Sequence, residues 1–463
     1  MNISRTARTR RPGFTLIEVL VAAGLCMLIM VVMTQAFAAG LDTFSVLKST
    51  GELQERLAVA GTVLQTDLAA THLENQVGEP TRVSGIRFDK IGAPGFEQTA
   101  RPPYRGFFRI QQEGISTPEG TGVDLDTIPC TRADGSTGKG HILHMAVKLP
   151  GTRQDRAFTA NLPNAFWDTT DPNYGNAPYP ALRSTQFLTN LQSSKNDYPV
   201  QWAEVAYFLN PTSTGTTASG TTQLYSLHRR IRILTADDNT GISWLPYQAA
   251  LPGMSCNRVI PPSPPAPPGT GKFLNGPGDI TVPDNRLGGK SGMRSVTSPA
   301  TIDDFAALGT GDDILLSNVI SFEIKANWDA GFGIPSPGWV VPSDPRPLSA
   351  TFEVPFDDLP AFPSVAANAA TYPNGNGNPS FSRSNLTPID LARPRVFDTW
   401  TDRAPHTNWA RPDVFVSAGP PQLNNPNPSY VPLPIRLKAI QIKLRIYDPK
   451  NKLARQITLI QDM

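Results

Sequence analysis

The chain opens with one long apolar run and continues with much shorter ones. Residues 19–41 read VLVAAGLCMLIMVVMTQAFAAGL and contain no charged side chain. As a helix rising about 1.5 Å per residue, this run would reach about 34 Å, which is long enough to cross a bilayer. Residues 1–13 hold four arginines and no acid, so the positive-inside rule keeps this end cytoplasmic. The pattern predicts a single-pass membrane protein whose remaining chain is exported.

After residue 41 the apolar positions take up helical spacing. Intervals of three or four residues separate Leu53, Leu57, Ala60, Leu64 and Leu68. Charged and amide side chains fill the positions between them, so the spacing predicts an amphipathic helix over residues 42–77 that continues the membrane helix. We expect this helix to end near Gln76, because Gly78 and Pro80 follow.

The remaining chain alternates apolar and polar residues with a period of two, which is typical of half-buried strands. Six runs show this alternation: His141 to Leu149, Gln201 to Leu209, Gln223 to Leu234, Ile314 to Trp328, Ile435 to Tyr447 and Lys452 to Gln461. A turn at Asp448-Pro449-Lys450-Asn451 is expected to join the last two runs as a hairpin. The predicted fold class is therefore α+β, a long N-terminal helix packed on a β-rich head of residues 78–463.

Two stretches of the head have the composition of inserted loops. The chain contains 46 prolines and 37 glycines among 463 residues, and PPSPPAPP at 261–268 is the densest group. It predicts a polyproline-type spacer within an insertion at about 257–300. A second insertion, at about 330–432, contains PNGNGNPS and LNNPNPS and has few apolar runs.

One carboxylate stands at the start of the apolar segment. An ionised Glu18 deep in a bilayer would cost up to about 3 kcal/mol, so the residue suggests a function. Taken alone, it could also be an acid that reaches the headgroup boundary. Its neighbours carry more information, because Gly13-Phe14-Thr15-Leu16-Ile17-Glu18 follows the arginines directly and leads into the apolar run.

This string resembles the class III signal of type IV pilins and pseudopilins. The resemblance implies that residues 1–13 are a basic leader, and that prepilin peptidase cuts between Gly13 and Phe14 and N-methylates the new terminal Phe14. The segment 14–41 then remains as the transmembrane helix. Within the family, the acid at the position of Glu18 acts in assembly. A buried carboxylate that pairs with the terminal amine of a neighbouring subunit is relieved of its desolvation cost.

The strand sequences extend the resemblance. WAEVAYFLN at 202–210, LYSLHRRIRIL at 224–234, LLSNVISFEIKANWD at 315–329 and PIRLKAIQIKLRIYD at 434–448 resemble successive strands of the minor pseudopilin J and minor pilin W group. This implies a pilin-like head and a structural subunit of a type II secretion pseudopilus or a type IV pilus, at or near the filament tip. The implied partners are prepilin peptidase, other pilin or pseudopilin subunits and, before assembly, inner-membrane lipid. The departure from the group is the size of the head.

Other export signals fit less well. Ala36-Phe37-Ala38 has the form of a secretory cleavage site, but the apolar run exceeds the usual 7 to 15 residues of a signal peptide. Cys26 lacks the small preceding residue of a lipoprotein site, and Pro12-Gly13 separates Arg10-Arg11 from the apolar run. An alternative remains open, in which the chain is a signal-anchored envelope protein whose β-rich head binds a ligand or another protein.

Charge and motifs argue against nucleic-acid binding and catalysis. The chain has 41 Lys and Arg against 39 Asp and Glu, and loss of the leader would make it slightly acidic, with no polybasic patch expected. It contains no G-x-S-x-G, H-E-x-x-H or zinc-type Cys/His spacing, so we expect no enzyme, cofactor or metal site. The phosphate-loop mimic at 267–273 and the S-x-x-K spacing at 136–139 both lack their companion residues.

Histidines, acids and cysteines offer weaker candidates for binding or cross-linking. His141 and His144 point to opposite faces of one strand and cannot chelate one metal. The acids at 124, 126, 237 and 238 lack the full calcium-loop pattern. Cys130 and Cys256 both belong to the exported head, where a disulfide can form, and two separate buried thiols are an equal alternative.

Overall fold

The computed structural model divides the chain into two compact units, residues 1–55 (the anchor unit) and residues 56–463 (the head unit). A single helix, α1 (Leu16–Leu68), contributes residues to both units. The structure describes residues 13, 15–75, 77–86, 103–113, 140–150, 157–161, 197–210, 214–218, 220, 222–234, 253–258, 272–281, 286, 312–330, 356, 359, 395–399 and 435–463.

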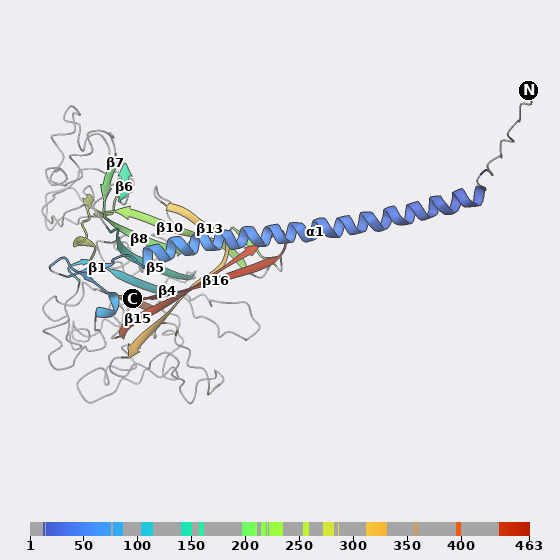
Figure 1. Cartoon of the computed structure of the whole chain (residues 1–463). Coiled ribbons are helices and arrows are strands. Elements are labelled where there is room, and N and C mark those ends of the chain that lie inside the picture. The colour runs from blue at the N-terminus through green and yellow to red at the C-terminus, as the bar shows by residue number, and fades with distance from the viewer. Residues whose placement is uncertain are drawn as a thin grey trace, which may run out of the picture. The chain divides into compact units, whose positions relative to one another are not determined.

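Helix α1 has 53 residues and is continuous from its start near Gly13 (Figure 1). It ends at Leu68, so the predicted end near Gln76 is wrong. The ring of His72 lies against the last turn, with Nε2 3.1 Å from the Leu68 carbonyl oxygen. Thr71 already pairs with Lys148 of the sheet as an isolated bridge. Long-range pairing therefore takes over before Gly78 and Pro80 can act as helix stops.

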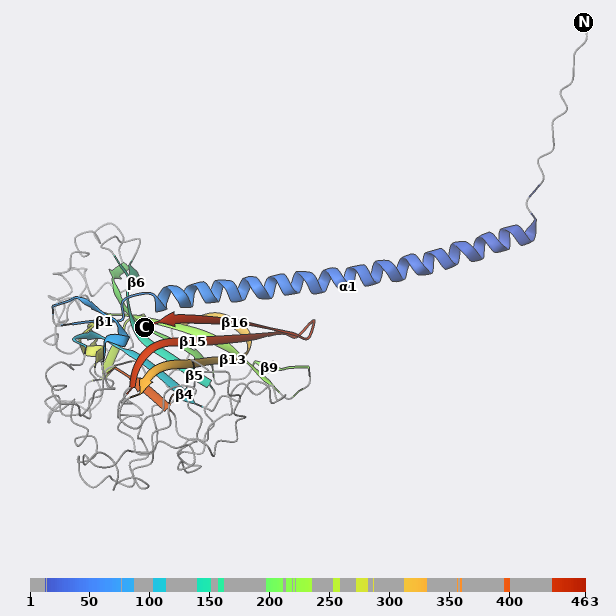
Figure 2. The same cartoon turned by 60° about the horizontal axis from the view of Figure 1, so that its bottom comes forward.

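The core of the head unit is one antiparallel sheet (Figures 1 and 2). Its order is β14 (Arg395–Asp398), β4 (Phe108–Glu113), β5 (Gly140–Lys148), β8 (Trp202–Leu209), β10 (Gln223–Ile233), β13 (Asp312–Ala330), β15 (Ile435–Asp448) and β16 (Leu453–Asp462), with β9 (Gly215–Thr216) paired to β10. All six runs of alternating residues are thus strands, and the β15–β16 hairpin forms as predicted. The α+β fold class is confirmed.

Strand β13 bends and closes the sheet. Up to Val319 it pairs with β10, and beyond that residue it pairs with β15. Asn318, next to the change of partner, has a φ of 57°. Past the bend, side chains of β4 and β5 bond to the backbone of Ile324, on the edge of β13 that does not face β15. Its amide donates to His141 Nδ1 at 2.7 Å, and its carbonyl accepts from Gln112 Nε2 at 2.6 Å. The curled sheet thereby reaches back to β4 and β5.

The last turns of α1 pack on one face of this sheet. Buried Leu57, Ala60, Leu64 and Leu68 form the helix side of the contact. Gly61 permits a close approach, because a Cβ there would lie 3.1 Å from Ile457 Cδ1. The sheet side is the set of alternating apolar residues that the sequence predicts to share a face, including Leu143, Met145, Ile440, Ile442 and Leu444, all buried.

Short elements surround the sheet, some of them in the stretches expected to be insertions. A three-stranded sheet joins β2 (Pro80–Thr81), β1 (Leu73–Glu74) and β3 (Arg105–Gly106), and the 3-10 turn η1 (Val83–Gly85) follows β2. Two-stranded pairs form from β6 (Phe158–Asn161) with β7 (Asp197–Val200) and from β11 (Cys256–Arg258) with β12 (Lys272–Leu274). Strand β12, the turn η7 (Asp279–Thr281) and β14 fall within the expected insertions, and composition did not predict them.

Candidate functional site

Thr15 and Glu18 form a reciprocal cap at the start of α1. The Thr15 amide and hydroxyl donate to Glu18 Oε2 at 2.9 and 3.0 Å, and the Glu18 amide donates to Thr15 Oγ1 at 3.4 Å. A capping box of this kind satisfies backbone N–H groups that have no partner within the helix. It places the carboxylate at the positive end of the helix dipole, and the exposed Gly13 lies two residues before the cap in sequence. The placement of Phe14 lies outside the described residues.

The first part of α1 exposes apolar side chains on all sides. Every residue from 15 to 44 is exposed, and Leu16, Met30 and Phe37 show 82%, 70% and 69% of their surface. By length and composition, this helix is long and apolar enough to cross a membrane. A surface of this kind is covered by lipid or by other proteins, because water disfavours it.

A buried ion pair fastens the end of α1 to the sheet within the head unit. Asp67, 4% exposed, receives two hydrogen bonds from Arg229 of β10, at 2.8 and 2.9 Å. The Tyr207 hydroxyl of β8 donates to the same carboxylate at 2.5 Å. Burial, and then the Asp67 charge, raise the pKa of Tyr207, so its hydroxyl stays a donor. The geometry fixes which turn of the helix sits on these strands.

The segment that leaves α1 is held just as tightly. His72 Nδ1 lies 2.7 Å from the Ala146 carbonyl oxygen, and burial lowers the pKa of this ring despite the carbonyl contacts that favour its charge. Gly106 passes directly beneath it with a φ of 77°, where a Cβ would lie 2.0 Å from the His72 carbonyl oxygen. Glu74 pairs with Lys148 and Arg105. This end of the helix is an anchored structural joint.

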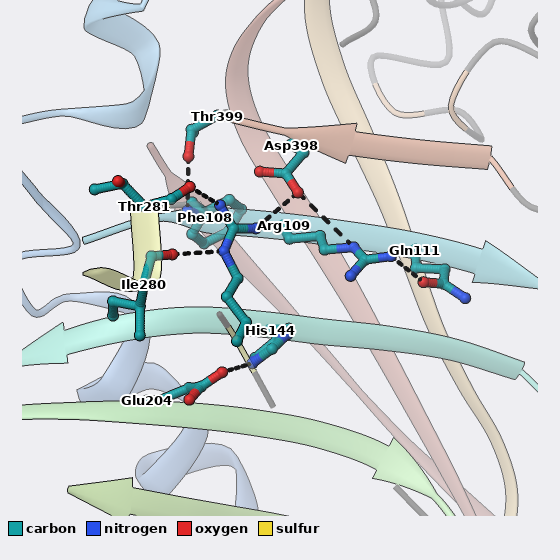
Figure 3. Close-up of polar contacts among 10 residues, drawn as sticks. Phe108, Arg109, Gln111, His144, Glu204, Ile280, Thr281, Asp398 and Thr399 are labelled. Atoms are coloured by element: carbon teal, nitrogen blue, oxygen red, sulfur yellow. Dashed lines mark hydrogen bonds and ion pairs between the residues drawn. The ribbon is translucent and has the colours of Figure 1, made fainter. Parts of the chain in front are cut away.

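The opposite face of the sheet carries a buried polar cluster (Figure 3). Arg286 stacks on the Phe107 ring at 3.8 Å and donates to Asp398 at 2.7 Å. It also donates to the carbonyl oxygens of Ile280 and Thr281, both at 2.6 Å. Burial lowers the pKa of its guanidinium, and the Asp398 charge opposes that shift. One arginine therefore ties η7 to β14, although the two lie more than 100 residues apart in sequence.

His144 of this cluster also takes part in buried hydrogen bonds that link separate elements of the head. His144 Nε2 lies 2.8 Å from Glu204 Oε1, while Ser255 donates to the other carboxylate oxygen at 2.5 Å and receives a bond from Asn275 at 2.9 Å. Because Ser255 bonds to the carboxylate and not to the imidazole, the arrangement lacks the nucleophile–base contact of a serine hydrolase. Burial lowers the pKa of His144, and the hydrogen bond that its ring donates to the Glu204 carboxylate opposes this shift.

Of the histidine, acid and cysteine candidates from the sequence, the structure describes the two histidines and leaves the others untested. His141 and His144 contact β13 and β8 respectively, and no group of metal-ligating side chains occurs among the described residues. Cys130, the acids at 124, 126, 237 and 238 and the S-x-x-K segment lie outside the described residues. The backbone of Cys256 lies in β11, but its side chain is not described, so the disulfide stays a prediction.

Sequence reasoning missed both polar clusters of the head. Asp67 was only a polar position between helix leucines, and Arg286 and Asp398 fall in stretches that composition marks as loops. A search of protein-family models, of curated proteins and of solved structures finds no match to this chain. The N-terminal residues and the fold that follows them are therefore the features that bear on function.

Proposed function

We propose that this chain is a minor pilin or pseudopilin, a non-enzymatic subunit of a type II secretion pseudopilus or a type IV pilus. In this proposal prepilin peptidase cuts after Gly13 and methylates Phe14. The head is exported, and α1 remains in the inner membrane until the subunit enters a filament. There the helix packs among other subunits, at or near the filament tip.

The observation that carries the proposal is the contrast between the exposed apolar first part of α1 and its packed last turns. The helix starts two residues after Phe14, exposes apolar side chains through its first part and packs its last turns on an antiparallel sheet. A subunit that moves from a bilayer into a helical filament core needs such a surface, because lipid and neighbouring helices can cover it in turn. The combination of this surface with the Gly13-Phe14 signal supports the filament over a plain membrane anchor.

The cap at Thr15 and Glu18 supports a role in docking. Two hydrogen bonds, from the Thr15 amide and hydroxyl, hold the carboxylate at the very start of the helix, and the Glu18 amide donates a third to the Thr15 hydroxyl oxygen. Cleavage would create a charged amine on the adjacent Phe14, and the same amine on a neighbouring subunit is a stronger partner than the Thr15 hydroxyl. Exchange of one partner for the other would link assembly to processing.

The bulk of the head supports a minor position. Packed helices lie about 10 Å apart, and a head of residues 78–463 would collide with its own copies at that spacing. A tip subunit avoids this collision because no identical head lies beyond it. Quantification of subunits in purified filaments tests this point, and a chain found as the repeating subunit would contradict the tip position.

Processing is tested with matched glycine variants. The chain is produced together with a prepilin peptidase, and Gly13→Val is compared with Gly24→Val. Gly24 lies within the exposed helix, where a Cβ meets nothing within 4 Å. We expect Gly13→Val to keep its leader and Gly24→Val to lose it as the unmodified chain does. An unmodified chain that keeps residues 1–13, as Gly13→Val does, would favour the signal-anchored envelope protein.

Docking is tested with matched acid variants. Glu18→Gln removes the charge at the helix start, while Glu52→Gln removes a surface acid whose 3.9 Å pair with Lys48 is exposed. We expect both variants to be processed and only Glu18→Gln to be missing from filaments. Normal incorporation of Glu18→Gln would remove the assembly role from this residue.

A further inference from the structure

The β15–β16 hairpin gathers positive charge that the net charge of the chain conceals. Residues 435–463 contain seven Lys and Arg but only two acids, Asp448 and Asp462. The chain without its leader is slightly acidic as a whole, and this balance led to the expectation that it carries no polybasic patch. That expectation is wrong for residues 435–463. An overall balance of charge gives no information on where the charges lie.

The charges of the hairpin are not equally available. Near its open end, Arg436 and Lys438 both pair with Asp329, at 3.4 and 2.5 Å. Near its turn, Lys450, Lys452 and Arg455 are all exposed. The positive charge that can meet a partner is therefore concentrated at the turn.

The turn is built to hold these side chains outward. Asp448 Oδ1 accepts the Lys450 amide at 2.9 Å, and Oδ2 accepts the Asn451 side-chain amide at 2.9 Å. Lys452 takes up a left-handed backbone with a φ of 58°. The only acid of the turn thus serves to shape it, and the lysines on either side of Asn451 face solvent.

The turn projects toward the end of the head unit at which α1 enters it. Leu459 and Ile457 of β16 lie against Gly61 of the helix. From Leu459 back to Leu453 the strand covers about 20 Å. Within the head unit, both views show the β15–β16 turn at the far end of the hairpin from the C-terminus (Figures 1 and 2). The β9–β10 segment, residues 214–225, contains no charged residue that would offset the basic turn.

Connectivity brings this end close to a bilayer. The expected membrane segment ends at about Leu41, and residues 42–55 of α1 join it to the head unit. As helix, these fourteen residues span about 21 Å, so the start of the head unit is tethered within about that distance of the bilayer. The connection therefore keeps the basic turn within reach of the membrane from which the chain emerges.

We propose that Lys450, Lys452 and Arg455 form a contact site for anionic phospholipid headgroups, which the head uses while the subunit waits in the membrane. Each basic side chain near an anionic surface strengthens binding about fivefold. Three such residues hold the hairpin on the bilayer at low salt and release it readily when the subunit leaves for the filament. The inference uses the membrane anchoring of the proposed function but not the cleavage after Gly13.

Lysine footprinting of the full chain tests the contact. The protein is reconstituted in nanodiscs of zwitterionic lipid alone or with anionic phosphatidylglycerol, and acylation of each lysine is followed by mass spectrometry. In about 50 mM salt we expect Lys450 and Lys452 to react about fivefold more slowly in the anionic discs, and about 500 mM salt should abolish the difference. Lys438, paired with Asp329 at the open end of the hairpin, should react equally in both.

A matched pair of charge reversals completes the test. Arg455→Glu leaves both reporter lysines in place and should remove most of their protection. Arg82→Glu makes the same change at an exposed residue beside η1, and should leave the protection intact.

Equal reactivity of Lys450 and Lys452 in the two lipids, or protection in zwitterionic discs as well, would overturn the proposal. Protection that appears only when an acidic filament subunit is added would assign the patch to a protein partner instead. A chain that fails to be cleaved after Gly13 would still give the predicted footprint.

Discussion

The two parts of α1 place leucines and ion pairs in opposite environments. Leu28 in the anchor unit is 62% exposed, whereas Leu64 in the head unit is fully buried. Lys48 and Glu52 form an ion pair with side chains 68% and 53% exposed, while Arg229 and Asp67 form one with side chains 16% and 5% exposed. The same helix therefore serves as a packed core element at one end, and at the other it presents a surface that needs a partner.

The difference shows where the specificity of this molecule lies. Burial, hydrogen bonds and charge pairing fix the last turns of α1 on their strands within the chain itself. The first turns have no such partners among the described residues of their own unit, apart from the cap at Thr15 and Glu18. Stability of the head and coverage of the anchor should therefore respond to different substitutions.

The largest effect is expected where the chain leaves α1. Gly106→Ala places a methyl group 2.0 Å from the His72 carbonyl oxygen, in a backbone region that already disfavours side chains. We expect a loss of about 4 kcal/mol or more in unfolding free energy, or no folded head. Gly78→Ala has a similar φ of 82° but open space, and should lose about 1 to 2 kcal/mol. Urea unfolding of the full chain in detergent, followed by tryptophan fluorescence, separates the two. Equal losses would mean that the close contact with His72 does not matter.

Leucine truncations compare the two ends of the helix directly. Leu64→Ala should lower the unfolding free energy of the head by about 3 kcal/mol, because it removes fully buried methyl groups. Leu28→Ala should leave the urea midpoint unchanged, since detergent covers that position in the folded and unfolded head alike. A similar loss in both variants would show that the whole helix folds as one cooperative element.

The ion pairs offer a similar contrast. Asp67→Ala leaves Arg229 without its partner in a largely buried site, and we expect a loss of about 3 kcal/mol. Glu52→Ala breaks only the exposed pair with Lys48 and should change the unfolding free energy by less than about 0.5 kcal/mol. Thermal unfolding of both variants measures this difference. A small effect at Asp67 would mean that Arg229 finds water or another acceptor.

Acid should also lower the stability of the head more than that of the anchor. We expect this effect to be smaller than those of the buried substitutions above. Burial lowers the pKa of both His72 and His144 in the folded head below the ordinary value of 6.5. Their contribution is complete above pH 6.5, and it falls as the pH drops toward the folded pKa, because the unfolded chain takes up protons first. Between about pH 7.5 and 5.5 we expect a loss of about 1 kcal/mol for each histidine. Urea midpoints across this range test the slope, and a flat profile would mean that both rings stay accessible to protons.

Much of the architecture could be predicted from pattern alone. The strands β5, β8, β10, β13, β15 and β16 follow period-two alternation, because each has one face in the core and one face that tolerates polar residues. The amphipathic spacing of α1 identified its buried positions for the same reason. Local sequence signals fail where a contact between distant segments determines the structure. At Leu68, the pairing of Thr71 with Lys148 ends the helix early.

The polar clusters could not be predicted, because their members are unrelated in sequence. Arg286 and Asp398 are 112 residues apart in sequence and meet only in the folded head. The basic turn of the β15–β16 hairpin could have been found from the local charge of residues 435–463, which the net charge hid. The candidate cleavage site was accessible to sequence because the peptide itself carries that signal.

The central claim is that the exposed part of α1 belongs to a processed filament subunit. The mass of the mature protein, extracted from membranes of a cell that makes prepilin peptidase, tests it most directly. We predict a chain that begins at Phe14 and carries one added methyl group on its amine. A chain that still begins at Met1, or one that begins after Ala38, would contradict the account.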